Sequence, residues 1–146
     1  MKILGVDCEG VIFRAYGNSI QGSFESLRKI QKSGLFERIY IISRVGLIGR
    51  IYFPFRLWLM NFSERTGIPW KNIYFCRRQE EKAIICKRLG VTDFVDDKFK
   101  VLRHMKNLER RYAFNSKAED IENYSKGNEN VIVVGSWAEL LPMLLS

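Results

Sequence analysis

Short apolar runs alternate along the chain with longer segments in which apolar residues recur every three or four positions. A short apolar run is typical of a buried strand, and the longer spacing is typical of an amphipathic helix. Their alternation predicts an α/β, Rossmann-like fold of three layers, with a mostly parallel central sheet between helices. The predicted strands are Lys2–Val6, Arg38–Ile42, Ile73–Cys76, Asp93–Val95, Tyr112–Phe114 and Val131–Val134. The predicted helices are Ser23–Gln31, residues 49–65, Glu80–Leu89, Val101–Arg110 and Trp137–Leu145.

Residues that favour helix ends support several of these boundaries. Ser23 is a candidate N-cap, because a serine hydroxyl can accept a hydrogen bond from a free amide of the first turn. Pro54 must lie in the first turn of its helix or kink it. We interpret residues 115–130, rich in Asn, Ser, Lys and Glu, as a loop around one short helix. The predicted helix stops are Gly34, Gly67 and Gly90.

Length and composition indicate one globular domain over residues 1–146. No apolar stretch is long enough to cross a bilayer, since the best candidate, Ile51 to Met60, is interrupted by Pro54 and Arg56. We therefore expect no membrane partner, and we expect no signal peptide because the first apolar run breaks at Asp7. Three cysteines without a CxxC pair argue against a disulfide framework or a zinc site and fit a reducing cytoplasm.

The formal net charge of +8, with a pI near 9.6, favours anionic partners. Nucleic acid and phosphorylated substrates are both in this class. A basic, solvated surface without a specific partner is the alternative interpretation.

Polar side chains meet the apolar runs at four places, three of which are predicted strand ends. In an open parallel sheet, ligands bind just beyond the carboxyl ends of the strands. Two acid pairs, a hydroxyl and an ammonium gathered there would suit magnesium-assisted phosphoryl transfer through a carboxylate nucleophile. These side chains are Asp7 with Glu9, Ser43, Lys82, and Asp96 with Asp97.

Each of these residues also has a simpler interpretation. The first acid pair could begin a polar turn, and Asp96 with Asp97 could cap a helix that begins near Lys98. Lys82 competes with Lys87 and with plain solvent exposure. His104, the only histidine, is predicted to be a surface residue.

The order of the motifs carries a resemblance to a known family. The segment Asp7-Cys8-Glu9-Gly10-Val11 resembles the first motif, DxDGT or DxDGV, of the haloacid dehalogenase-like (HAD) hydrolase superfamily. Ser43 and Lys82 resemble its second and third motifs. The run Phe94-Val95-Asp96-Asp97 resembles the fourth, a buried strand that ends in two aspartates. The resemblance extends over nearly the whole chain.

The resemblance implies a role for each matched residue. Asp7 would be the nucleophile and a Mg²⁺ ligand, and Glu9 would contribute its main-chain carbonyl to the metal. Asp96 would bind the metal directly, and Asp97 directly or through water. Phosphate would be bound by the Ser43 hydroxyl, the main-chain amide of Arg44 and the Lys82 ammonium.

Glu9 departs from the pattern, because phosphatases of this superfamily usually carry aspartate there as the general acid and base. Glutamate is longer by one carbon–carbon bond, roughly 1.5 Å. A displacement near 1 Å can lower a rate on the order of 100-fold. The sequence therefore supports the fold and the metal site better than efficient turnover.

The spacing between the motifs leaves no room for an inserted cap domain, so the chain resembles a small, capless member. An open site would admit a macromolecular substrate, or a neighbouring subunit would cover it. Arg77 and Arg78 follow the strand that ends at Cys76 and are candidate contacts for the substrate anion. The aromatic residues from Tyr52 to Phe62 are predicted to be core, and an exposed part would suggest self-association.

Three hypotheses follow. The first is a Mg²⁺-dependent phosphatase that forms an aspartyl-phosphate on Asp7, with Glu9 as an atypical acid and base. The second is a non-catalytic or weakly active protein that binds an anionic partner, protein or nucleic acid. The third, a nucleic-acid end phosphatase, predicts basic residues clustered beside the site: Arg77, Arg78, Arg103, Lys106, Arg110 and Arg111.

Overall fold

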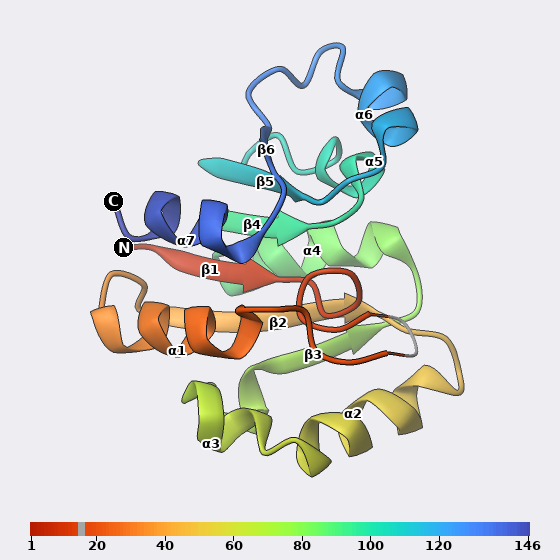
Figure 1. Ribbon diagram of the computed structural model, residues 1–146. Helices are drawn as coiled ribbons and strands as arrows, with labels where there is room; N and C mark the ends of the chain where they lie inside the picture. The colour runs from red at the N-terminus through yellow and green to blue at the C-terminus, as the bar shows by residue number, and fades with distance from the viewer. Residues whose placement is uncertain (15–16) are drawn as a thin grey trace.

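The computed structural model describes residues 1–14 and 17–146. Its centre is a six-stranded sheet in which every neighbouring pair of strands is parallel (Figure 1). The strand order is β3-β2-β1-β4-β5-β6, which places the first strand in the middle. The strands are β1 (Ile3–Val6), β2 (Arg38–Arg44), β3 (Ile73–Cys76), β4 (Asp93–Asp96), β5 (Arg110–Phe114) and β6 (Ile132–Val134).

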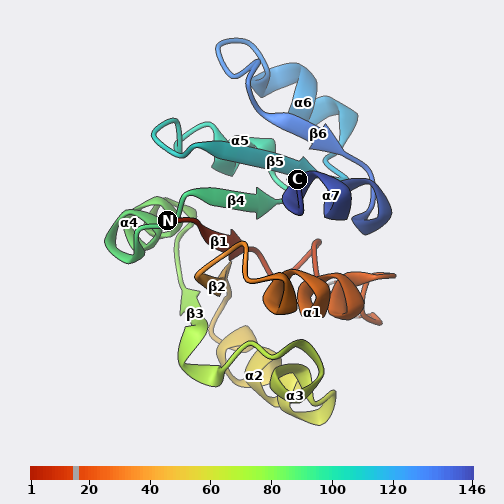
Figure 2. The same cartoon turned by 90° about the vertical axis from the view of Figure 1, so that its left-hand side faces the viewer.

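Helices cover both faces of the sheet (Figure 2). The helices on one face are α1 (Ser23–Ser33), α2 (Gly49–Leu59), α3 (Phe62–Thr66) and α7 (Trp137–Leu144). The other face is covered by α4 (Gln79–Leu89), α5 (Phe99–Leu102) and α6 (Ala118–Tyr124). A short 3₁₀ turn, Trp70–Asn72, precedes β3. The predicted three-layer α/β/α fold is therefore confirmed, and each described segment between strands contains helices and no inserted domain.

The apolar runs of the sequence become strands because the sheet has a core on each face. Val6 and Ile41 pack with α1 and α7, and Ile42 and Phe94 pack with α4 and α5. A strand that is buried on both faces cannot alternate between apolar and polar residues, which is why these runs are continuous. All four residues of β1 are buried.

The predicted helix Val101–Arg110 is wrong. The helix α5 ends at Leu102, and Arg110 and Arg111 belong to β5. The Arg111 guanidinium is buried and donates to the Leu102 carbonyl at 2.8 Å and to Asn130 Oδ1 at 2.5 Å. These partners satisfy a charged group inside the protein, which the periodicity of a basic segment does not reveal.

Two other helix predictions need correction. The predicted helix over residues 49–65 is two helices, because Asn61 adopts a left-handed conformation (φ 53°) between α2 and α3. Ser23 does not cap α1, since its hydroxyl donates to the Ile12 carbonyl at 3.2 Å. The predicted stops are confirmed, as the three helices end at left-handed glycines: Gly34, Gly67 and Gly90.

The aromatic segment divides between core and surface, so its interpretation as core is only partly confirmed. Phe53 and Phe62 are buried, whereas Phe55 is 54% and Trp58 is 63% exposed. These exposed rings belong to a helix face that residues 1–14 and 17–146 leave largely uncovered. None of the described helices has the length and hydropathy required to span a bilayer.

Candidate active site

The acids identified in the sequence lie at the carboxyl edge of the three central strands. Val6 at the end of β1 is in register with Ile41 of β2 and with Val95 of β4. The amide of Asp7 donates to the Val95 carbonyl at 2.9 Å, which extends the pairing by one residue and brings Asp7 beside Asp96. Parallel pairing therefore collects residues that are distant in sequence at one edge.

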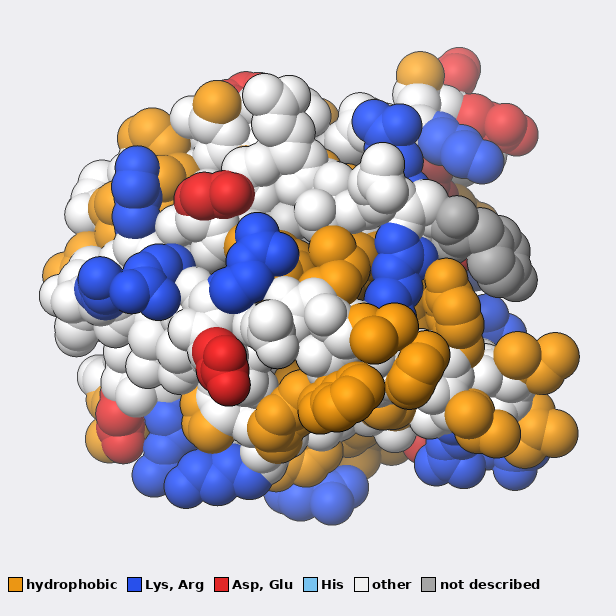
Figure 3. All heavy atoms as spheres, turned by 60° about the horizontal axis from the view of Figure 1, so that its bottom comes forward, with side chains coloured by type: hydrophobic (Ala, Val, Ile, Leu, Met, Phe, Trp, Pro, Cys, Tyr) orange, Lys and Arg blue, Asp and Glu red, His pale blue; other side chains and the backbone are white. Residues whose placement is uncertain are grey.

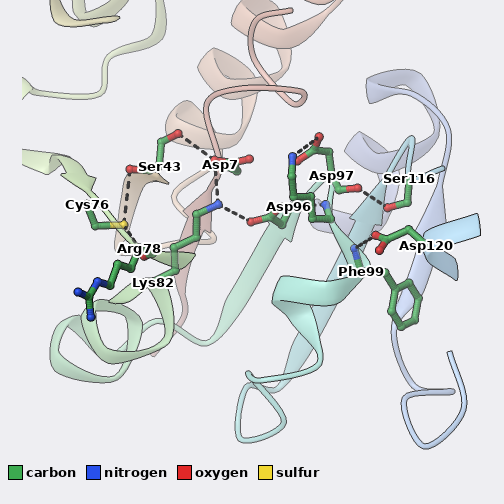
Figure 4. A network of polar contacts seen from close by, with 11 residues as sticks. Asp7, Ser43, Cys76, Arg78, Lys82, Asp96, Asp97, Phe99, Ser116 and Asp120 are labelled. Carbon is green, nitrogen blue, oxygen red and sulfur yellow. Dashed lines mark hydrogen bonds and ion pairs between the residues drawn. The ribbon is translucent and has the colours of Figure 1, made fainter. Parts of the chain in front are cut away.

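A polar network joins these side chains inside the protein (Figure 4). The Ser43 hydroxyl donates to Asp7 Oδ1 at 2.9 Å, and Lys82 Nζ lies 3.2 Å from the same oxygen. Lys82 Nζ also donates to Asp96 Oδ2 at 2.8 Å. Ser43, Lys82 and Asp96 are at most 1% exposed. Lys82, and not the exposed Lys87, is thus the lysine of the site.

Three carboxylates form a group that could hold a metal ion. One oxygen each from Asp7, Asp96 and Asp97 lie within 4.8 Å of one another. Asp97 Oδ1 is buried and has no hydrogen-bond partner among the described residues. Lys82 and the half-exposed Lys98, 3.6 Å from Asp97 Oδ2, bring two positive charges to three carboxylates. Oxygen ligands with excess negative charge are the donor set that Mg²⁺ prefers, so the residues fit this ion.

The electrostatics of the free site also favour a cation. Burial, opposed by Lys82, raises the pKa of Asp7 to about 6. Burial and the charges of Asp7 and Asp96 raise the pKa of Asp97 to about 8. Burial alone would lower the pKa of Lys82, but the two carboxylates that it contacts raise it above its ordinary value. Lys82 therefore stays charged, whereas the acids carry a surplus of repulsion that a divalent ion would relieve.

Gly10 allows the chain to turn at the site. Its φ is 86°, and a β-carbon at this position would overlap the carboxylate of Asp97. Asp96 Oδ1 accepts a hydrogen bond from the Lys98 amide at 2.9 Å, so Asp96 shapes the turn before α5 while it contacts Lys82. Asp96 therefore belongs to the acid site and also binds a main-chain amide before α5. It does not cap α5 in the strict sense, because this helix has no side-chain hydrogen bond at its N-cap.

The other predicted site residues lie near the network but outside it. Glu9 is partly exposed at the start of the following loop, and its carboxylate is not one of the three clustered acids. Arg44 is exposed and its Nε donates to the Arg77 carbonyl at 3.3 Å. The Arg78 side chain points away from Asp7 (Figure 4). The structure brings these residues to the carboxyl edge without a direct contact to the acids.

Arg77 and Arg78 lie at this edge, but two other basic residues of the nucleic-acid hypothesis do not. Arg110 is in register with Asp93, at the amino ends of β4 and β5 and therefore away from the acids. Arg111 is buried. The six residues therefore do not form the single cluster that this hypothesis predicts.

A cavity that the sequence did not reveal adjoins the acids. It has a volume of about 1030 Å³ and touches Gly10 and Asp97. Arg14 and Lys29 also line it, together with Asn115. No motif singles out these residues, since they come from three separate segments. Ser116 was missed as well, and its hydroxyl donates to the Asp97 carbonyl at 2.6 Å.

Comparisons with solved structures place this arrangement in a known fold. The chain is similar to D,D-heptose 1,7-bisphosphate phosphatase from Burkholderia thailandensis, with 17% identity and a TM-score of 0.70. That match covers 100% of this chain and 99% of the other. The chain has the haloacid dehalogenase-like fold. No protein-family model and no curated protein matches the sequence.

A second structure with the HAD-like fold agrees. It is the cobalt-bound deoxy-D-mannose-octulosonate 8-phosphate phosphatase of Haemophilus influenzae, with 16% identity and a TM-score of 0.60. The match covers 99% of this chain and 87% of that one. At these identities the comparisons establish the HAD-like fold that the motifs predicted, and the chemistry must be argued from the residues of the site.

Proposed function

We propose that this HAD-like protein is a divalent-metal-dependent phosphatase that hydrolyses a phosphomonoester through a phosphorylated Asp7. The observation that carries the proposal is the Asp7 carboxylate, buried at the carboxyl edge and contacted by Ser43 and Lys82. Both contacts use Oδ1, and we assign the attack on phosphorus to Oδ2. A carboxylate that forms a covalent intermediate divides a difficult displacement into two easier steps.

The metal site would consist of Asp7, Asp96 and Asp97 with the main-chain carbonyl of Glu9. A bound Mg²⁺ would offset the repulsion between the attacking carboxylate and the phosphate dianion. Within the chain, the Lys82 ammonium has three donors, of which Asp7 and Asp96 use two. The third would bind a phosphoryl oxygen.

Ser43 would change its partner during the reaction. A hydroxyl has one proton to donate, and in the free protein it is donated to Asp7. When Asp7 bonds to phosphorus, this donor would turn to a phosphoryl oxygen, and the Arg44 amide would add a second donor. After this change of partner, Ser43 and the Arg44 amide would stabilise the negative charge of the phosphoryl group during its transfer.

Glu9 would serve as the general acid and then as the general base. It would give a proton to the departing ester oxygen as the Asp7–phosphorus bond forms. It would then take a proton from the water that attacks the phosphoryl-aspartate, which releases phosphate and restores Asp7. The extra methylene makes Glu9 the weakest member of the set, so we expect modest turnover.

The cavity beside Gly10 and Asp97 would receive the alcohol part of the substrate. Its lining by Arg14, Lys29 and Asn115 suits a polyhydroxylated or anionic leaving group. The two similar structures are named for phosphatases of phosphorylated sugars, which supports a phosphosugar as the substrate class to test first.

The decisive test measures phosphate release from an aryl phosphate with Mg²⁺. We expect Asp7→Asn to abolish turnover, and Glu9→Asp to keep or raise it. Asp93→Asn is the matched control, because Asp93 is also buried but begins β4 at the opposite edge. Turnover by Asp7→Asn equal to that of the parent would refute the nucleophile assignment.

A second measurement tests the substrate class. Lys29→Ala should raise the KM for a phosphosugar more than that for an aryl phosphate, because a simple aryl group has no hydroxyl or anionic group for Lys29 to bind. If none of the forms hydrolyses any of a varied set of phosphoesters, the alternative of a non-catalytic binding protein is favoured. The exposed apolar face of α2 is the observation that keeps this alternative open.

A further inference from the structure

An exposed apolar face runs along α2 and the loop before it. Within the helix, Phe53 and Leu57 turn to the core, and the exposed residues recur at spacings of three and four. Three aliphatic members are the most exposed, led by Ile48 at 82% and Ile51 at 78%. We define this face as the α2 patch, which comprises Leu47, Ile48, Ile51, Tyr52, Phe55, Trp58 and Leu59.

Figure 3 shows hydrophobic side chains gathered on this face of the molecule, with more Lys and Arg than Asp and Glu side chains at their margins. A contiguous exposed apolar surface of this kind marks an interaction site in soluble proteins. The opposite face of α2 already packs against the core through its buried residues, so the packing of the helix does not depend on the exposed face. The exposed aliphatic side chains of the patch therefore form a surface that a partner could cover.

The charge around the patch defines that partner. Residues 44–63, from the end of β2 through α2, contain three arginines and not one acidic or lysine residue. Arg56 lies against the patch, with its guanidinium 5.8 Å from the ring centre of Tyr52 and 4.8 Å from that of Phe13. The segment is thus apolar and cationic throughout, and its complement is an anionic surface that can also receive aliphatic side chains.

A second copy of the chain does not provide an anionic surface at this contact. In a twofold dimer the same patch contacts itself, which would bring arginines against arginines with no acid from this segment between them. Nucleic acid is anionic, but it is a poor partner for aliphatic side chains. Bases stack on aromatic rings, but the most exposed residues here are aliphatic.

A bilayer with anionic lipids is negatively charged and can receive aliphatic side chains. Interfacial helices combine aliphatic and aromatic residues on one face with arginine at its border, and tryptophan and tyrosine favour the level of the headgroups. Arginine beside the bilayer adds attraction to anionic lipids. We propose that the α2 patch binds the surface of an anionic membrane peripherally. This differs from the expectation of no membrane partner, which rested on the absence of a spanning segment.

Because of the position of the α2 patch, membrane contact would also affect the candidate active site. The patch begins at Leu47, four residues after Ser43, and α2 starts beside the carboxyl ends of the strands (Figure 1). Membrane contact would therefore hold the carboxyl edge of the sheet close to the lipid surface. The binding itself does not depend on the proposed phosphatase activity.

The test is sedimentation of the full chain with vesicles, without substrate or metal. One set is phosphatidylcholine, and the other contains about one third phosphatidylglycerol. We expect binding to the anionic set only, weakened by salt. Ile48→Ser/Ile51→Ser should reduce it at least about tenfold, since each serine removes apolar surface that would be buried. Phe55→Ser/Leu59→Ser serves as an independent variant if the first does not fold.

The matched control is Trp70→Ser, because Trp70 is 45% exposed but lies outside the patch. Its binding should equal that of the parent. Failure to bind anionic vesicles would overturn the proposal, and so would equal binding by the parent and both patch variants. A dimer or a nucleic-acid complex that the patch variants disrupt, without vesicle binding by the parent, would also overturn it and assign the patch to that partner.

Discussion

At the carboxyl edge of the sheet, Lys82 and Asp96 are at most 1% exposed, whereas on α2 Ile48 and Ile51 are about four-fifths exposed. Charges lie inside in one region, and large apolar side chains lie outside in the other. The buried charges have partners within the chain, since Lys82 contacts both Asp7 and Asp96. The aliphatic side chains of the α2 patch, by contrast, are largely uncovered by the described residues. Both regions depart from the usual burial pattern, and such departures concentrate where proteins function.

Replacing Lys82, the buried charge at the carboxyl edge, should have the largest effect on stability. Lys82→Met leaves Asp7 and Asp96 buried without their shared cation, and it should lower the free energy of unfolding of the metal-free protein by about 3–5 kcal/mol. Urea unfolding near neutral pH measures this change. Lys87→Met is the control, because Lys87 is exposed and its replacement should have almost no effect. Equal losses for both variants would mean that the Lys82 network does not hold the site together.

Gly10→Ala should have the next largest effect. The variant must adopt a φ of 86° and move the carboxylate of Asp97, and we expect a loss of about 1–3 kcal/mol together with weaker Mg²⁺ binding. In Gly34→Ala, φ is 72° but no heavy atom lies within 4 Å of the new carbon, so only about 1 kcal/mol should be lost. Calorimetric Mg²⁺ titration should separate the two, since Gly34→Ala leaves the acids in place. Unchanged Mg²⁺ affinity in Gly10→Ala would contradict the site geometry.

The stability of the protein should also depend on pH, in a way that depends on metal. The pKa of Asp7 is raised to about 6 and that of Asp97 to about 8, while both acids ionise near pH 4 in the unfolded chain. Between these values the folded state binds more protons than the unfolded state, so the stability of the metal-free protein should fall as pH rises from 4 to 8. Mg²⁺ binds the ionised acids and should raise the melting temperature more at pH 8 than at pH 6. An equal increase at both values would count against these acids as the ligands.

The smallest effect is expected on the α2 patch. Ile51→Ala should change the free energy of unfolding by less than about 0.5 kcal/mol, because Ile51 is exposed. Leu57→Ala, on the buried side of the same helix, should cost about 2–5 kcal/mol. Thermal or urea unfolding compares the two. A large loss for Ile51→Ala would indicate that the exposed face supports the fold and is not reserved for a partner.

The sequence predicted the sheet and the acid site because both depend on local patterns. Apolar runs such as that before Asp7 can be buried on both faces only in a central parallel strand, and such strands meet at one edge. The gathering of Asp7, Ser43, Lys82 and Asp96 at one point was predicted from the strand ends and the order of the motifs, but the contact of Lys82 with Asp96 was not. The distances, the free Asp97 oxygen and the raised pKa values depend on packing and could not be predicted.

The errors arose where distant partners override local pattern. Arg111 appeared to be part of a basic helix, but Asn130 and the Leu102 carbonyl bind its guanidinium inside the protein. The break at Asn61 depends on a left-handed residue that the apolar spacing does not show. The exposure of Phe55 and Trp58 was also not predictable, because the same spacing describes a helix that faces a core and one that faces a partner.

A crystal structure with Mg²⁺ and a fluoride analogue of the phosphoryl group tests the central claim most directly. We predict one ion bound by oxygens of Asp7 and Asp96 at about 2.0–2.1 Å, with the analogue on Asp7 Oδ2 beside Lys82. An ion bound elsewhere, or an analogue held without contact to Asp7, would contradict the account.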